Sequence, residues 1–152
     1  MTTMLRDTII YKTLSIYDEL NSAKEDDARM DVKSEILKRK LVVICRGVYG
    51  DDLLNMAKAI YDGGLRCIEV TFDQSDAQGV EKASKAVEQL NGVCGGELLV
   101  GAGTVLDAEQ VVAAMNAGAT YIISPNVDDD VIRLTKELKL VSIPGAMTPR
   151  SE

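Results

Sequence analysis

The chain alternates short apolar runs with stretches in which apolar residues recur every three or four positions. The apolar runs have the length of strands and occupy residues 41–47, 66–72, 98–103, 121–124 and 140–145. The intervening stretches have the periodicity of amphipathic helices. This repetition, at about 20 to 30 residues per strand and helix, predicts an α/β fold with a parallel sheet covered on both faces.

The clearest unit spans residues 98–127 and reads strand, helix, strand, which is a βαβ unit. Asp107 followed three residues later by Gln110 has the spacing of a capping box. Gly118 predicts a left-handed end to that helix, and Asp128 is expected to cap the next helix. The sequence therefore fixes both ends of the central helix.

Other helix boundaries are less sharply marked. Asp51 or Asp52 is expected to begin the helix after the first strand, because an acidic residue there can cap it. Residues 31–40 read as one helix with a basic last turn, and Ile36 and Leu37 are expected to face inward. The sequence thus predicts one helix before the first strand and one after each of the first four strands.

Residues 1–29 differ from the rest of the chain and are interpreted as an N-terminal extension. Ile10, Leu14 and Tyr17 have helical spacing, and a polar run follows them. The segment is either a mobile extension or a helix that docks on a partner or covers an open edge. The predicted organisation is therefore an extension over 1–29 and one domain over 30–152.

Charge and composition exclude several classes of protein. The formal net charge is −7, and no basic block or basic-aromatic pattern occurs, so a nucleic-acid partner is not expected. No apolar run reaches the roughly 18 residues of a membrane span, and no signal-peptide core begins the chain. An odd count of three cysteines without metal-ligand spacing indicates reduced thiols, so a cytoplasmic protein without membrane partners is expected.

The chain contains no histidine. This excludes Ser-His-Asp and Cys-His triads, histidine zinc sites and histidine acid-base chemistry. Any catalysis must use carboxylates, lysine, hydroxyls or thiols, and no metal ligand set is expected.

Glu69 is a carboxylate in the middle of an apolar strand. Strand alternation places its neighbours on two faces, Cys67, Glu69 and Thr71 on one and Ile68, Val70 and Phe72 on the other. The second face should meet the helices, so Glu69 should point to the opposite side, where burial raises a carboxyl pKa. Two interpretations follow: a functional carboxyl, or a structural glutamate held by a buried arginine such as Arg46.

Two architectures fit five strand-helix repeats. One is a doubly wound sheet of the flavodoxin or Rossmann type, but the turn after the first strand, CRGVYGDD at 45–52, matches its glycine fingerprint poorly. The other is a (β/α)₈ barrel, whose sites form at the carboxyl ends of the strands.

Four motifs in order, GLRCIEVTF, VGAGTV, AGATYIISPNV and IPGAMTP, resemble the 2-keto-3-deoxy-6-phosphogluconate / 4-hydroxy-2-oxoglutarate aldolase family over residues 30–152. The resemblance implies a TIM-type (β/α)₈ barrel and a class I aldolase without metal or cofactor. It implies reversible cleavage of 2-keto-3-deoxy-6-phosphogluconate or 4-hydroxy-2-oxoglutarate to pyruvate and an aldehyde, in a homo-oligomer that is a trimer in the family.

The resemblance also implies roles for individual residues. Glu69 corresponds to the general acid/base, and Thr104 and Pro125 line the pyruvate end of the site. Arg46, at the end of the first strand, is a candidate for holding a carboxylate. Some relatives carry an arginine four residues after the catalytic glutamate, a position held here by Asp73, so carboxylate binding by that route is not expected.

The class I mechanism needs a Schiff-base lysine, which the family carries on a sixth strand. None of the five predicted strands contains a lysine. The expected fold is therefore an incomplete barrel of about five βα units, C-terminally truncated and inactive alone. The alternative function is a non-catalytic assembly or binding protein built from the partial barrel. Unpaired apolar edges on the first and fifth strands predict self-association, or cover by residues 1–29.

Overall fold

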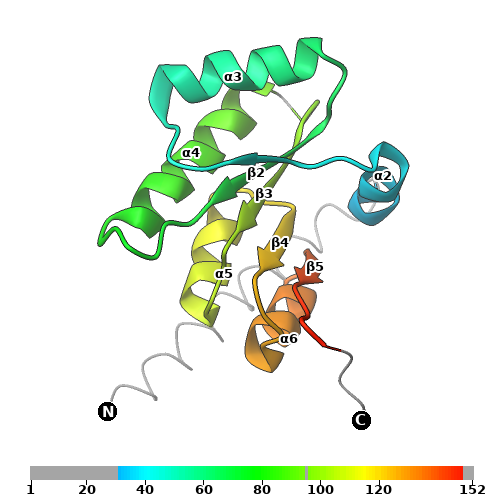
Figure 1. The fold of residues 1–152 in the computed structure, drawn as a ribbon, viewed down its shortest axis with the longest axis vertical. Helices are drawn as coiled ribbons and strands as arrows, with labels where there is room; N and C mark the ends of the chain where they lie inside the picture. Colours follow the sequence, from blue (N-terminus) through cyan, green and yellow to red (C-terminus); the bar gives the residue numbers. More distant parts are fainter. Residues whose placement is uncertain (1–30, 95, 149–152) are drawn as a thin grey trace, which may run out of the picture. The chain divides into compact units, whose positions relative to one another are not determined.

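A computed structural model of the chain describes residues 31–94 and 96–148, so the predicted extension over 1–29 lies outside the described residues. Five parallel strands form one sheet: β1 Val43–Cys45, β2 Cys67–Thr71, β3 Leu99–Gly103, β4 Tyr121–Ser124 and β5 Val141–Pro144. Each strand pairs with the next one along the chain, in the order β1-β2-β3-β4-β5 (Figure 1). A flavodoxin-like sheet would instead place β1 between β2 and β3. The consecutive order is that of a (β/α) barrel of the TIM type, which confirms that prediction over the alternative.

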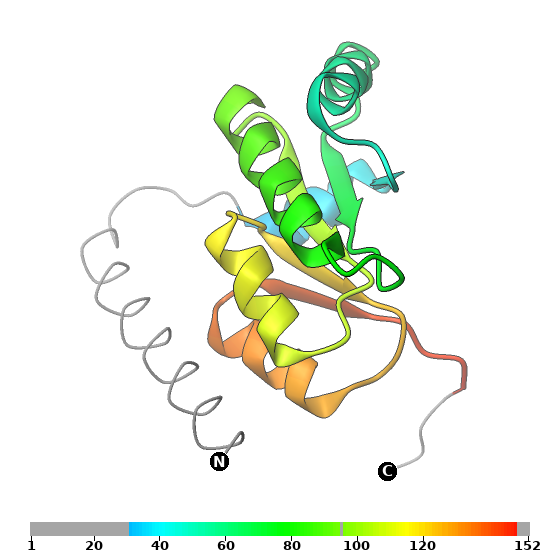
Figure 2. The same ribbon diagram turned by 90° about the vertical axis from the view of Figure 1, so that its left-hand side faces the viewer.

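Helices lie on both sides of the sheet. They are α2 Val32–Arg39, α3 Gly50–Asp62, α4 Gly79–Cys94, α5 Ala108–Asn116 and α6 Asp129–Glu137. The helices α4, α5 and α6 cover one face, and α2 lies behind the opposite face (Figure 2). We call the face toward α3 to α6 the outer face and the opposite one the inner face.

The outer face carries most of the core. Side chains of alternate strand residues meet apolar helix positions there and are almost fully buried: Ile68, Val70, Val100, Ala102, Ile122, Leu53, Ala57, Ala83, Val87, Leu90, Val111, Ala114, Val131 and Leu134. This is the face predicted for Ile68 and Val70. The residues between them on the strands are therefore left on the inner face.

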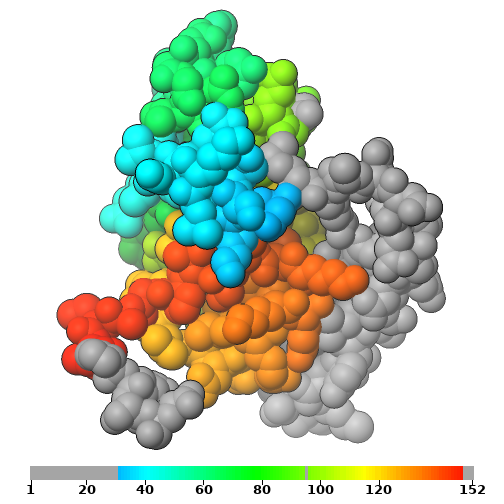
Figure 3. Space-filling view, turned by 90° about the vertical axis from the view of Figure 1, so that its right-hand side faces the viewer, coloured from blue at the N-terminus to red at the C-terminus, as the bar shows by residue number. Residues whose placement is uncertain are grey.

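The inner face has its own small core at the amino ends of the strands. Cys67, Leu99 and Tyr121 are buried there, and Val32 and Ile36 of α2 pack against them. The inner-face residues of β5 join the same cluster, so α2 and β5 lie side by side on this surface (Figure 3). The helix α2 thus closes the amino end of the inner face.

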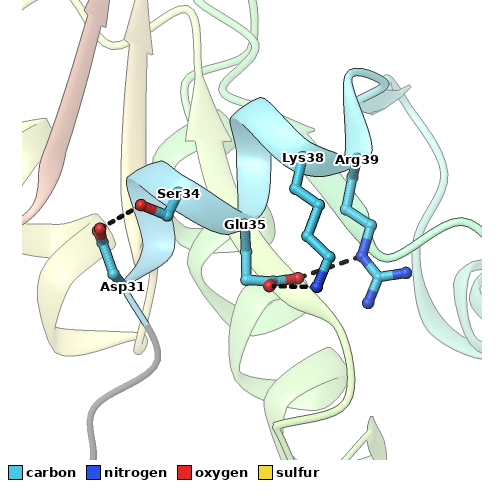
Figure 4. A network of polar contacts seen from close by, with 5 residues as sticks. All are labelled: Asp31, Ser34, Glu35, Lys38 and Arg39. Atoms are coloured by element: carbon cyan, nitrogen blue, oxygen red, sulfur yellow. Dashed lines mark hydrogen bonds and ion pairs between the residues drawn. The ribbon is translucent and has the colours of Figure 1, made fainter.

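The outward side of α2 is polar, except for one residue. Glu35 accepts hydrogen bonds from Lys38 and Arg39, and Ser34 donates to Asp31 at the start of the helix (Figure 4). Leu37 is 65% exposed, so the prediction that it faces inward is wrong. Ile36, the other residue predicted to face inward, is half-buried and contacts the inner core.

The predicted caps are confirmed for two helices. The Asp107 side chain accepts from Gln110 N, and that of Asp128 accepts from the backbone at the start of α6. The prediction for α3 is wrong, because its N-cap is Tyr49 and the helix begins at Gly50. The capping geometry comes from the extended backbone of Tyr49, so the two expected aspartates fall within the first turn.

The three cysteines form no disulfide within the described residues; Cys45 and Cys67 are buried and Cys94 is half-buried. Within residues 31–94 and 96–148, no helix combines the length and apolar character needed to span a membrane.

Candidate functional site

Glu69 lies on the inner face of β2 and is only 4% exposed. Its register partners are Ile44 on β1 and Gly101 on β3. The predicted direction of Glu69, away from the helices, is thus observed. A carboxyl group in this position is held among apolar residues and backbone rather than in water.

Two glycines of β3 make room for the side chains around Glu69. A Cβ added at Gly103 would overlap the Glu69 carboxyl group, and a Cβ at Gly101 would overlap the Tyr121 ring. The Tyr121 hydroxyl donates a hydrogen bond of 2.6 Å to the Ile68 carbonyl. At Gly101 and Gly103 the inner surface of β3 is therefore bare backbone, on which one side chain from each neighbouring strand rests.

Burial raises the pKa of Glu69 above its ordinary value near 4.5. Two opposing effects lower it: a 3.3 Å hydrogen bond donated by Thr71 Oγ1 and the positive charge of Arg46. Because burial is the largest of the three influences, the carboxyl keeps its proton to higher pH than a solvated glutamate.

Arg46 directly follows β1, and strand alternation places it on the inner face, two residues beyond Ile44. It is exposed and forms no ion pair with Glu69 in the part of the chain that the structure describes. The interpretation of Glu69 as a structural glutamate held by a buried arginine therefore finds no support in the geometry. Arg46 acts on Glu69 only through space.

Thr104 follows β3 and has a backbone φ of +57°. The left-handed region is costly for a β-branched residue, and such conformations concentrate at functional sites. Its side chain is half-buried, and its hydroxyl has no hydrogen-bond partner within the described residues. Thr104 is next to Gly103, so it lies one residue from the contact with Glu69.

Pro125 follows β4 and is exposed. Its carbonyl group lies so close to Gly145 that a Cβ there would be only 2.7 Å from it. Because all strands are parallel, Arg46, Thr104 and Pro125 lie at the same carboxyl edge of the sheet, and Glu69 lies within β2 below it.

The carboxyl group of Asp73 is used in hydrogen bonds within the turn that follows β2. It accepts from the backbone and hydroxyl of Ser75, and these hydrogen bonds hold its pKa below the ordinary range. Asp73 is therefore ionised, and its carboxylate is used within its own turn. Its negative charge stands where some relatives carry an arginine, so this position offers no cation to a substrate carboxylate.

Two further residues lie at this edge, Gln74, to which the sequence did not point, and Gln110, which it marked only as part of a capping box. Their side-chain amides bond each other, and Gln74 Nε2 donates to Thr104 O at 2.8 Å. The two glutamines are 36 residues apart, so no local pattern links them. None of the five described strands carries a lysine, as the sequence indicated.

Comparison with known proteins identifies similar enzymes. The family model "KDPG and KHG aldolase" matches residues 32–151. The chain is 32% identical over 113 residues to a probable 2-dehydro-3-deoxy-6-phosphogalactonate aldolase of Rhizobium meliloti, covering 74% of this chain and 50% of the relative. It is 32% identical to a 2-dehydro-3-deoxy-phosphogluconate aldolase of Haemophilus influenzae, covering 72% of this chain and 49% of the relative. The chain thus spans about half the length of these curated relatives.

Solved structures give the same picture. The 2-keto-3-deoxy-6-phosphogluconate aldolase of Zymomonas mobilis ZM4 matches with a TM-score of 0.65 and 26% identity, covering 78% of this chain and 53% of that one. The KDPG aldolase of Legionella pneumophila, captured with pyruvate as a covalent carbinolamine, matches with a TM-score of 0.59 and 27% identity. That match covers 70% of this chain and 48% of the Legionella chain.

Proposed function

Because the chain belongs to the KDPG and KHG aldolase family, we propose that residues 31–148 carry the proton-transfer and carboxylate-binding part of a class I aldolase site. The reaction is the reversible cleavage of a 2-keto-4-hydroxy acid to pyruvate and an aldehyde. The family match favours this function over a non-catalytic assembly or binding role. The observation that carries the proposal is the buried carboxyl group of Glu69 on the inner face, which forms no ion pair within the described residues.

Glu69 is the proposed general acid/base. Formation and dehydration of a carbinolamine and cleavage of the carbon-carbon bond each move a proton to or from a substrate oxygen. A carboxyl group with a raised pKa can both give and take that proton near the working pH. Burial of Glu69 supports this role, because it supplies the direction of shift that the chemistry needs.

Arg46, Thr104 and Pro125 form the proposed pyruvate end of the site. The hydroxyl of Thr104 has no hydrogen-bond partner within the described residues and can donate to a substrate carboxylate, and Arg46 supplies a positive charge on the same face. Pro125 shapes the neighbouring wall after β4. The substrate-binding partner is thus a small 2-keto acid, held by its carboxylate.

The Schiff-base nucleophile is not among these residues. The resemblance implies a lysine on a sixth strand, and the described strands contain none. Carbon-carbon bond cleavage therefore needs a site that also contains the Schiff-base lysine, and Glu69 and Thr104 are two members of that site. Within that proposal the protein is a cytoplasmic homo-oligomer, trimeric as in the family.

Borohydride trapping with pyruvate tests this division of roles. The 152-residue chain should gain no trapped adduct, because no lysine lies on the inner face of a described strand. The Legionella aldolase, captured with pyruvate as a carbinolamine, is the positive control. An adduct on a lysine of this chain, lost when that lysine is replaced, would refute the assignment.

Complementation tests the role of Glu69 itself. The chain is mixed with a separately expressed carboxyl-terminal half of the Haemophilus aldolase, and pyruvate release from 2-keto-3-deoxy-6-phosphogluconate is followed with lactate dehydrogenase. Glu69→Gln should lower the restored rate by about 10²- to 10⁴-fold, the usual contribution of general acid-base catalysis. Glu88→Gln, on the exposed side of α4, is the control. Equal rates for the two variants would contradict the proposed role.

A further inference from the structure

The side-chain amides of Gln74 and Gln110 form a reciprocal pair between two connections at the carboxyl edge of the sheet. Gln74 Nε2 lies 3.2 Å from Gln110 Oε1, and Gln110 Nε2 lies 3.0 Å from Gln74 Oε1. Gln74 belongs to the segment between β2 and α4, and Gln110 to the first turn of α5. The pair therefore ties the segment after β2 to the helix after β3.

Both amides also bond the backbone between β3 and α5. Gln74 Nε2 donates to Thr104 O at 2.8 Å, and Gln110 Oε1 accepts from Leu106 N at 2.9 Å. The glutamine pair thus provides hydrogen-bond partners for two backbone groups, Thr104 O and Leu106 N, which are two residues apart. Gln110 is nearly buried, so its amide has little water available to replace these bonds.

The backbone that these hydrogen bonds hold includes Thr104, which has a strained conformation. Thr104 has φ of +57°, a conformation that a β-branched residue adopts only when its surroundings enforce it. Without the glutamine pair, Thr104 O and Leu106 N would each lose a partner, and rotation of Thr104 to negative φ would become less costly. The direction of the Thr104 hydroxyl depends on that rotation.

We propose that Gln74 and Gln110 are positioning residues, which hold Thr104 in its left-handed conformation so that its hydroxyl faces a substrate carboxylate. This inference rests on the proposed role of Thr104 at the pyruvate end of the site. Gln74 acts through Thr104 and Gln110, and neither amide touches the substrate.

Site-resolved hydrogen exchange of the full chain, with and without pyruvate, tests the proposal. Gln74→Leu removes both amide functions, and Gln74→Glu keeps the shape but cannot donate to Thr104 O. Leu106 N donates to Gln110 and not to Gln74, so faster exchange at Leu106 N reports release of Gln110 through the pair. Gln78→Leu, an exposed glutamine in the same connection, is the matched control.

Both Gln74 variants should speed exchange at Leu106 N and raise the pyruvate concentration for half-maximal protection of residues 103–106 by about fivefold, as expected for one lost hydrogen bond. Gln78→Leu should change neither. An unchanged Leu106 rate, or faster exchange with unchanged pyruvate protection, overturns the inference. Absence of pyruvate protection in the wild type refutes the proposed carboxylate site instead, and the Leu106 rate then still decides whether Gln74 holds the loop.

Discussion

The carboxyl group of Glu69 occupies the space that a Cβ at position 103 would fill, so Glu69 and Gly103 fit together across two neighbouring strands. The contact depends on the lack of a side chain at Gly103. It places a titratable group against bare backbone one residue before Thr104. The geometry of the candidate site therefore depends on a residue that carries no functional group of its own.

Gly103→Ala should displace the Glu69 carboxyl and lower the free energy of unfolding by about 1–3 kcal/mol, the usual cost of overpacking a buried position. Urea unfolding measures the change. Gly92→Ala is the control, because a Cβ at Gly92 in α4 meets nothing within 4 Å. That variant should be neutral or more stable by up to about 1 kcal/mol. A Gly103→Ala variant as stable as Gly92→Ala would show that the overlap at position 103 is relieved without cost.

The raised pKa of Glu69 predicts a pH-dependent contribution to stability. Between its ordinary pKa near 4.5 and its higher folded-state pKa, the native state binds a proton that the unfolded state has lost. The contribution is therefore complete below pH 4.5 and is lost as the pH rises through the folded-state pKa.

Glu69→Gln, which stays neutral, should remove this loss, so its advantage over the wild type grows with pH. Urea unfolding from pH 4 to pH 8 measures the difference, with Glu88→Gln as the control for loss of one charge. A difference between wild type and Glu69→Gln that is constant over this range would contradict the inferred shift.

Tyr121→Phe should cost about 1–2 kcal/mol of stability, because the variant loses a buried 2.6 Å hydrogen bond to the Ile68 carbonyl. The ring remains, so its packing over Gly101 is kept and the change isolates the hydroxyl. Thermal and urea unfolding give the measurement. Tyr49→Phe, whose hydroxyl makes no hydrogen bond within the described residues, should change stability far less.

The sheet has β1 and β5 as its edge strands among the described residues, and Ile44 of β1 is 62% exposed. An exposed apolar edge favours pairing with another chain. We expect the 152-residue chain to self-associate at micromolar concentration, and Ile44→Lys to weaken this association. Sedimentation velocity measures both, with Val93→Lys, an exposed position on α4, as the control. A monomer at every concentration would refute the prediction.

Strand periodicity was sufficient to predict which side of β2 carries Glu69. Alternation is a property of the extended backbone, and the apolar outer residues of that strand leave no other solution. The caps at Asp107 and Asp128 were predictable for the same reason, since a cap depends on residues within one turn. The sequence was therefore sufficient to predict a contact wherever the two partners are close in the chain.

Long-range features could not be predicted in this way. Leu37 is exposed because only one side of α2 meets the inner face, and the position of that contact is set by the strands. In the sequence, Gly103 looks like any other glycine in a strand. Its importance becomes visible only when the structure places the Glu69 carboxyl group beside it. The positive φ of Thr104 runs against the preference of a β-branched residue, so the sequence argues for the opposite conformation.

The consecutive order of the strands has a consequence for synthesis on the ribosome. Glu69 emerges within β2, but Gly103, against which its carboxyl group rests, follows 34 residues later, and Tyr121 later still. The nascent chain therefore carries a hydrated, ordinary glutamate until the third strand has been translated and paired. Glu69 therefore acquires its buried environment and raised pKa during elongation, when β3 pairs with β2.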